Sequence, residues 1–151
     1  MSQLTTPELF DMSGHVAVIT GAGRGIGEGI AKSFSEAGAS VIVAARRTEE
    51  IDRVAAEINK SGVSAIAVTT DGTDEDDVEN LANAAIAEYG KLTTWVNNAG
   101  GSPMRMPLSD LPREEWDRTV ALNLTSIYIG CVTAAKYMTK GSIINLSLIH
   151  I

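Results

Sequence analysis

Thr20-Gly21-Ala22-Gly23-Arg24-Gly25-Ile26-Gly27 is a glycine-rich turn that directly follows the apolar run Val16–Ile19 and precedes a segment with helical patterning. Glycine at positions 21, 25 and 27 permits a tight turn, the close approach of an anion to backbone N–H groups, and close packing of a helix on a strand. A strict G-x-G-x-x-G cannot be placed on these residues, and the spacing that fits is T-G-x-x-x-G-x-G. The stretch predicts a cradle for the diphosphate of a dinucleotide, although an ordinary strand-to-helix turn would also carry glycines.

Short apolar runs alternate with longer segments of helical periodicity along the rest of the chain. This alternation is typical of βαβ units around a parallel sheet that is buried on both faces. The expected strands are Val16–Thr20, Val41–Ala45, Ala65–Thr69, Thr94–Asn97 and Ser142–Leu146. The expected helices run from Gly25 to Gly38, from an N-cap at Thr48 to Gly62, from an opening residue Thr73 to Gly90, and from about Arg113 to Thr139.

Right-handed crossovers would join these elements into one doubly wound α/β sheet of strand order 3-2-1-4-5. The topological switch then lies between the first and fourth strands, and ligands bind there at the carboxyl ends of the strands. The glycine-rich turn follows the first strand, and Asn97-Asn98-Ala99-Gly100 follows the fourth. We therefore expect these two distant motifs to form one site.

Composition limits the partners and the compartment. A chain of 151 residues with 44% hydrophobic content is expected to form one globular domain. Its net charge of −7 disfavours nucleic acid or an anionic membrane as a partner. The single cysteine, Cys131, allows no internal disulfide or zinc set and suggests the reducing cytoplasm. Residues 1–13 do not resemble a targeting segment, and no run approaches the roughly 18 apolar residues of a membrane span.

The glycine-rich turn and the Asn97–Gly100 motif, taken together, resemble the short-chain dehydrogenase/reductase family over nearly the whole chain. The resemblance implies a Rossmann-like fold and an oxidoreductase that transfers a hydride between a nicotinamide cofactor and a small alcohol or ketone. It also implies an N-terminal extension at 1–13 and an NAD(P)-binding domain at 14–151. Compared with the family, that domain of about five strands is truncated before the last helices and strands.

The family pattern implies a set of cofactor-binding residues in this chain: Gly21, Arg24, Gly25, Ile26, Gly27, Arg46, Asp71, Gly72, Asn98, Ala99 and Gly100. Asp71 matches an aspartate that hydrogen-bonds the adenine, and Gly72 replaces its usual apolar successor. Where NAD-binding members carry an aspartate at the end of the second strand, this chain has Ala45 followed by Arg46.

The missing acid, with Arg24 and Arg46 nearby, suits a 2′-phosphate because guanidinium groups make charged bidentate contacts. NADP(H) is expected in preference to NAD(H), which remains possible. In the alternative interpretation Arg46 and Arg47 are an ordinary solvated pair. Arg24 also resembles what some NAD-dependent members carry.

The catalytic residues of the family are only partly matched. Asn123 corresponds to a supporting asparagine on the fourth helix that holds a proton-relay water, and we expect it to be a buried amide. Ser147 lies one residue before the family's catalytic serine position, which is Leu148 here, so its side chain should face the opposite side. The Tyr-x-x-x-Lys pair is not present, and Tyr128 and Tyr137 are interpreted as packing residues.

Two functions remain open at this point. The chain is either the N-terminal part of an NADP-dependent oxidoreductase or a catalytically inactive dinucleotide-binding fragment. In intact relatives the long fourth helix forms much of a homo-oligomer interface, and the same is expected here. The acidic cluster Asp74–Asp77 is interpreted as a favourable first turn of a helix, with no metal site. The tail 148–151 fits the family poorly, which suggests a truncated or mis-joined reading frame.

Overall fold

The computed structural model describes residues 9–101 and 106–147. Five parallel strands form one sheet in the order β3-β2-β1-β4-β5. The expected α/β fold and strand order are confirmed. The strands are β1 (Val16–Thr20), β2 (Ser40–Ala45), β3 (Ala65–Thr69), β4 (Thr94–Asn97) and β5 (Ser142–Asn145). Only the bounds of β2 and β5 differ from those expected, each by one residue.

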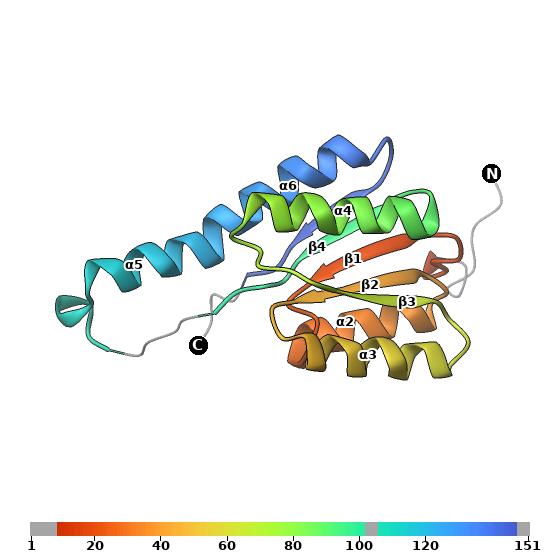
Figure 1. Ribbon diagram of the computed structural model, residues 1–151, viewed down its shortest axis with the longest axis horizontal. Helices are drawn as coiled ribbons and strands as arrows, with labels where there is room; N and C mark the ends of the chain where they lie inside the picture. Colours follow the sequence, from red (N-terminus) through yellow and green to blue (C-terminus); the bar gives the residue numbers. More distant parts are fainter. Residues whose placement is uncertain (1–8, 102–105, 148–151) are drawn as a thin grey trace.

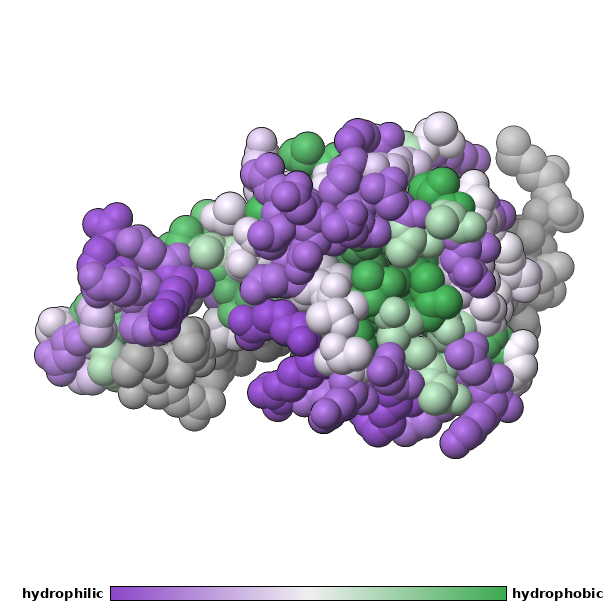
Figure 2. All heavy atoms as spheres, viewed as in Figure 1, coloured by the Kyte–Doolittle hydropathy of each residue, from purple (hydrophilic) through white to green (hydrophobic). Residues whose placement is uncertain are grey.

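Helices cover both faces of the sheet (Figure 1). One face carries α2 (Gly25–Glu36) and α3 (Thr48–Lys60), and the other carries α4 (Glu75–Tyr89) and α6 (Ser126–Tyr137). The central strands β1 and β2 are almost completely buried because they are sandwiched between these layers. The outer strand β3 is only half-buried, and Figure 2 shows hydrophobic atoms gathered over it, between α4 and α3.

Two of the expected helix caps are wrong, because the threonine hydroxyl groups bond other side chains instead of the helix N–H groups. Thr48 lies inside α3, and its hydroxyl is 2.7 Å from the hydroxyl of Thr69 on β3. Thr73 donates to the side chain of Asp71, so the N-cap of α4 is Asp74, which accepts from the N–H of Asp77. The end of α4 is as expected, with Gly90 as a left-handed C-cap.

The expected long helix from about Arg113 to Thr139 is present without a break from Arg113 to Tyr137, but a π-helical turn interrupts its α-helical hydrogen bonding. Its three consecutive segments are α5 (Arg113–Val120), the π-helical turn η2 (Ala121–Thr125) and α6. A short 3₁₀ helix, η1 (Leu108–Asp110), precedes α5. Among the described elements α5 packs only against η2, and it reaches away from the sheet (Figure 1). No helix in the described ranges is both long enough and apolar enough to cross a membrane.

The interpretation of two tyrosines as packing residues holds only in part. Tyr137 packs against the core, and its hydroxyl bonds Asn83 at 2.9 Å and also Glu79. Tyr128 is 65% exposed, so the interpretation is wrong for that residue. Together with Leu124 and Val132, at the same helical spacing, Tyr128 forms an exposed apolar stripe. The helix therefore presents one face to the core and leaves another uncovered.

Candidate cofactor site

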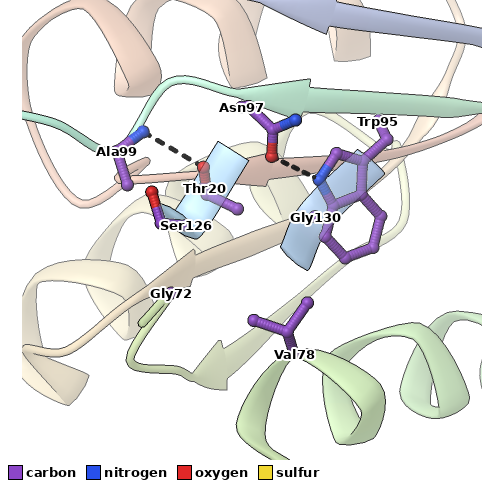
Figure 3. A pocket seen from close by; sticks show the side chains of 8 residues that line it. All are labelled: Thr20, Gly72, Val78, Trp95, Asn97, Ala99, Ser126 and Gly130. Carbon is purple, nitrogen blue, oxygen red and sulfur yellow. Dashed lines mark hydrogen bonds between the residues drawn. The ribbon is translucent and has the colours of Figure 1, made fainter. Parts of the chain in front are cut away.

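Thr20 joins the glycine-rich turn to the end of β4. Its hydroxyl accepts from the N–H groups of Asn98 and Ala99, each at 3.1 Å, and donates to the carbonyl of Val96 at 3.2 Å. Figure 3 shows the bond to Ala99. The Asn98 amide nitrogen in turn donates to the carbonyl oxygens of Thr20 at 2.8 Å and Gly21 at 3.2 Å. The structure thus brings the two sequence motifs into direct contact at the switch between β1 and β4.

Two glycines leave no room for a side chain in this turn. Gly21 has a φ of 64°, and a Cβ there would lie 2.9 Å from the Cα of Ala99. A Cβ at Gly27 would lie 2.5 Å from the Asn98 amide nitrogen and would also collide with the carbonyl oxygen of Gly21. Because α2 begins at Gly25, its first N–H groups lack acceptors within the helix. They are available to an anion, and the helix dipole favours one there.

The positively charged residues of the predicted set lie exposed around the turn. Arg24 is the N-cap of α2, and its side chain makes no capping bond. Arg46 directly follows β2 and is exposed, as is Ile26, with 53% of its surface accessible. Arg46 also acts on Asp71. Burial of Asp71 raises its pKa, but hydrogen bonds from Thr73 and the charge of Arg46 leave that pKa below its usual value. The Asp71 carboxylate is therefore ionised, and the positive charge of Arg46 stabilises the ionised form.

Asp71 is held rigidly after β3. Its Oδ1 accepts from the N–H of Thr73 at 2.9 Å and from the hydroxyl of Thr73 at 2.7 Å. Its own N–H donates to Asp77 Oδ2 at 2.8 Å. Asp74 and Asp77 of the acidic cluster are thus engaged in fixing the β3–α4 turn. Because Oδ1 is already occupied, Oδ2 is the oxygen that is left to contact a ligand.

A small cavity lies beneath the site, between β1, β4 and the helices on one face (Figure 3). Its volume of about 10 Å³ is at the lower limit for holding a single water molecule. Eight residues line it: Thr20, Gly72, Val78, Trp95, Asn97, Ala99, Ser126 and Gly130. A Cβ on Gly72 would lie 3.7 Å from the Cβ of Ser126, an ordinary van der Waals contact, so there is room for a small side chain at this position.

A hydrogen-bonded network centred on the buried side chain of Asn97 supports this part of the site and was not predicted from the sequence. Asn97 accepts from the indole N–H of Trp95 at 2.8 Å and donates to the side chain of Asn145 at 2.8 Å. Asn97 and Asn145 are register partners on β4 and β5, and Cys131 lies 3.5 Å from both side chains. Each of the apolar strands β4 and β5 ends in an asparagine, and this pattern could have predicted that Asn97 and Asn145 lie side by side.

Asn123 is exposed, so the expectation of a buried amide is wrong. Its amide nitrogen donates to the carbonyls of Gly101 at 2.7 Å and Thr119 at 2.8 Å, and its oxygen accepts from the N–H of Gly101 at 2.9 Å. A Cβ on Gly100 would lie 2.9 Å from the same oxygen. Asn123 therefore fastens the π turn to the segment that follows β4, and π turns frequently occur at functional sites.

The remaining predicted positions lie near the end of β5 or outside the described ranges. Ser147 is exposed, two residues after β5. Leu148, the rest of the tail to Ile151, and Ser102–Arg105 lie outside the described residues.

A cluster of charged side chains, which was not predicted from the sequence, joins α2 to α3 beside the turn. Arg53 donates to the carbonyl of Gly23 at 3.1 Å, to both oxygens of Glu28 at 2.9 and 3.1 Å, and to Glu57 at 3.0 Å. Lys32 bonds the same two carboxylates, Glu28 at 2.6 Å and Glu57 at 2.8 Å. Hydrogen bonds from Arg53 and then Lys32 lower the pKa of Glu28 from 4.5 to about 2.

This lowered pKa predicts how stability depends on pH. Glu28 stays ionised in the folded state at a pH where the unfolded chain binds a proton, so its contacts stabilise the fold above about pH 4.5. The contribution is lost as the pH falls toward about 2. In thermal unfolding, Glu28→Gln should therefore be less stable than the parent protein near neutral pH, and the difference should shrink below about pH 4.5. Glu57, whose pKa the same cations lower, is unchanged in both proteins. A difference that persists undiminished to about pH 2 would contradict the assignment.

Comparison with known proteins places these features in context. A family model described as short chain dehydrogenase matches residues 15–150. A cis-4-hydroxycyclohexanecarboxylate dehydrogenase from Sinomonas cyclohexanicum is 38% identical over 137 residues, which cover 89% of this chain and 55% of that protein. A short-chain type dehydrogenase/reductase from Mycobacterium marinum, whose crystal structure is known, is 36% identical in sequence. The two structures superpose with a TM-score of 0.90 over 94% of this chain and 59% of that protein's chain.

A further solved structure is a 7α-hydroxysteroid dehydrogenase in complex with NADH and 7-oxo glycochenodeoxycholic acid. It is 35% identical with a TM-score of 0.89, over 96% of this chain and 57% of that one. The chain therefore spans little more than half the length of the proteins it matches.

Proposed function

The chain belongs to the short-chain dehydrogenase family, and on this basis we propose that it forms the cofactor-binding part of an NADP(H)-dependent oxidoreductase. The reaction is hydride transfer between the nicotinamide and a small alcohol or ketone. The observation that carries the proposal is the contact between the turn at 20–27 and Asn98, which leaves the first N–H groups of α2 available to a diphosphate. When bound, the cofactor supplies the hydride acceptor or donor.

The choice of NADP(H) over NAD(H) rests on charge at the end of β2. Ala45 occupies the position where an acid would bind the ribose hydroxyls and repel a 2′-phosphate. Arg46 follows it with an exposed guanidinium, and Arg24 lies exposed at the start of α2. The ionised Asp71 neighbours Arg46, on the side assigned to the adenine. This arrangement supports recognition of a 2′-phosphate by Arg46 and Arg24.

The variant Arg46→Asp tests this specificity. The substitution removes a cation from the 2′-phosphate and adds an anion, and charged hydrogen bonds contribute about 1.5–3 kcal/mol each. We expect the dissociation constant of NADPH to rise by about ten- to a hundredfold and that of NADH to change by less than about threefold, as measured by fluorescence titration. Arg47→Asp, which alters a neighbouring arginine paired with Glu50 at 2.5 Å, serves as the control. Equal affinity of the parent protein for both cofactors would refute the preference.

A catalytically inactive dinucleotide-binding module is the second candidate. In the printed sequence no tyrosine is followed four residues later by lysine, because those positions are Thr93, Val132 and Gly141. The exposed Ser147 is a doubtful replacement for a catalytic serine, and Asn123 is bonded to backbone groups. NADPH oxidation by the purified 151-residue chain with a panel of ketones would refute the inactive module, whereas binding without turnover would support it.

The partners and location are proposed on separate grounds. The exposed stripe of Leu124, Tyr128 and Val132 supports a homo-oligomer in the intact protein, formed through this helix. The free Cys131 suits the reducing cytoplasm. The net charge of −7 argues against nucleic acid as a partner.

A further inference from the structure

Arg53 holds the glycine-rich turn from α3, whereas Asn98 holds it from the end of β4. One guanidinium nitrogen, Nη2, donates both to the carbonyl of Gly23 and to Glu28, and Nη1 donates to Glu28 and Glu57. We propose that Arg53 is a positioning residue that fixes the turn in the conformation that accepts the dinucleotide diphosphate. The inference deepens the proposed function and rests on it.

Holding a carbonyl also fixes the N–H group of the next residue, because a peptide unit is planar and trans. In such a unit the C=O and the N–H point in opposite directions. The bond from Arg53 draws the Gly23 carbonyl toward α3 and so aims the N–H of Arg24 away from it. The Asn98 side chain holds the carbonyls of Thr20 and Gly21, and the N–H of Ala22 donates to the carbonyl of Ala44 at 3.1 Å, so the N–H groups left for an anion are those from Arg24 onward. With the Gly23 carbonyl directed toward α3, the end of the turn that leads into α2 is prepared to offer its N–H groups to an anion.

Arg53 also restrains the carboxylate that lies nearest to the turn. Glu28 is in the first turn of α2, and its side chain is only 18% exposed. A carboxylate that could move toward the helix N-terminus would occupy the N–H groups and repel a diphosphate. The paired bonds from the guanidinium fork hold Glu28 on the α3 side. The Arg53 side chain therefore orients the N–H groups of the turn and also holds Glu28, which would compete with a diphosphate for them, away from the turn.

Lys32 provides a matched comparison, because it carries the same charge and bonds the same two carboxylates. In the described part of the chain it bonds no carbonyl of the turn. Removing Lys32 should alter the charge of the cluster without releasing Gly23. A lysine at position 53 would keep the charge but lack the fork that reaches Glu28 and Gly23 together.

The test uses Arg53→Met, Arg53→Lys and Lys32→Met in the purified protein. Two quantities are measured below the unfolding transition: the dissociation constants of NADPH and NADH, and hydrogen exchange of the amides at 21–27. We expect Arg53→Met to raise both dissociation constants about tenfold and to speed exchange in the turn. Arg53→Lys should behave similarly. Lys32→Met should change affinity less than about threefold and leave exchange in the turn unaltered.

Several results would overturn the inference. If Arg53→Met and Lys32→Met lose the same nucleotide affinity, or if Arg53→Lys keeps the affinity of the parent protein, the effect of position 53 is one of net charge alone. Unchanged hydrogen exchange at 21–27 in Arg53→Met would mean that the conformation of the turn does not depend on Arg53. Faster exchange with unchanged nucleotide affinity would mean that the bond to Arg53 is not needed for binding. If the parent protein binds neither nucleotide, the proposed function fails. The exchange comparison then still decides whether Arg53 fixes the turn, because it requires no nucleotide.

Discussion

Gly27→Ala is expected to weaken the binding of NADPH by about a hundredfold or more. The added Cβ would lie 2.5 Å from the Asn98 amide nitrogen and 2.9 Å from the Cα of Ala22, and it would collide with the carbonyl of Gly21. Backbone atoms cannot give way as a flexible side chain can, so the turn must open and separate from Asn98. The N–H groups of the first turn of α2 would then no longer converge on one anion. Isothermal titration with NADPH measures the loss.

Gly29→Ala is the matched control for this variant, two residues further along α2. A Cβ at Gly29 meets nothing within 4 Å, and alanine is preferred to glycine inside a helix. This control should retain affinity and gain about 0.5–1 kcal/mol in the free energy of unfolding. Circular dichroism of Gly27→Ala separates loss of the site from loss of the fold. A folded Gly27→Ala protein with near-parental affinity would show that the turn does not bind the diphosphate.

Gly130→Ala is expected to produce the largest loss of stability, about 3 kcal/mol or more. Gly130 is the point at which α6 passes over the buried network on β4. A Cβ there would lie 2.8 Å from the indole nitrogen of Trp95 and would overlap the side-chain oxygen of Asn97. Accommodation requires either moving α6 away from the sheet or breaking the bond between Trp95 and Asn97, and a buried polar group left without a partner is costly.

Chemical denaturation of Gly130→Ala and Gly29→Ala measures opposite effects of the same substitution in two helices. The first should lower the free energy of unfolding and the second should raise it. Trp95 is fully buried and Trp116 is 50% exposed, so with the substitution Trp116→Phe in both proteins the fluorescence reports the environment of Trp95 in the network. A loss below about 1 kcal/mol in Gly130→Ala would mean that α6 shifts without strain and that the network does not fix its distance from the sheet.

The sheet and the location of the site were predictable from sequence because they depend on local patterns. Apolar runs separated by helical segments define the strands, and parallel connection places the carboxyl ends of β1 and β4 together. The turn at 20–27 and Asn98 therefore had to meet, and Asn98 does bond Gly21. The family was recognisable from the same two motifs, and the match over residues 15–150 confirms it. The cofactor preference and the individual roles of the predicted site residues remain predictions.

Features that depend on contacts distant in sequence were not predictable. Thr48 looked like a cap, but its hydroxyl bonds Thr69, 21 residues away. Asn123 lies in a helical pattern, yet its bonds to Gly101, 22 residues away, accompany a π turn that the periodicity does not indicate. Arg53 has nothing in its local sequence that would link it to Gly23, 30 residues away. In each case the outcome was decided by packing between elements.

The π turn η2 has a consequence for how the molecule could diversify. Packing against the sheet fixes α6, whereas α5 contacts only η2 among the described elements. Each residue of an α-helix advances the chain by about 100° around the axis. Loss or gain of one residue within Ala121–Thr125 would therefore swing α5 around the axis while α6 and the turn at 20–27 kept their places. Insertion or deletion of one residue at this junction would therefore reorient α5 and leave the turn at 20–27 in place.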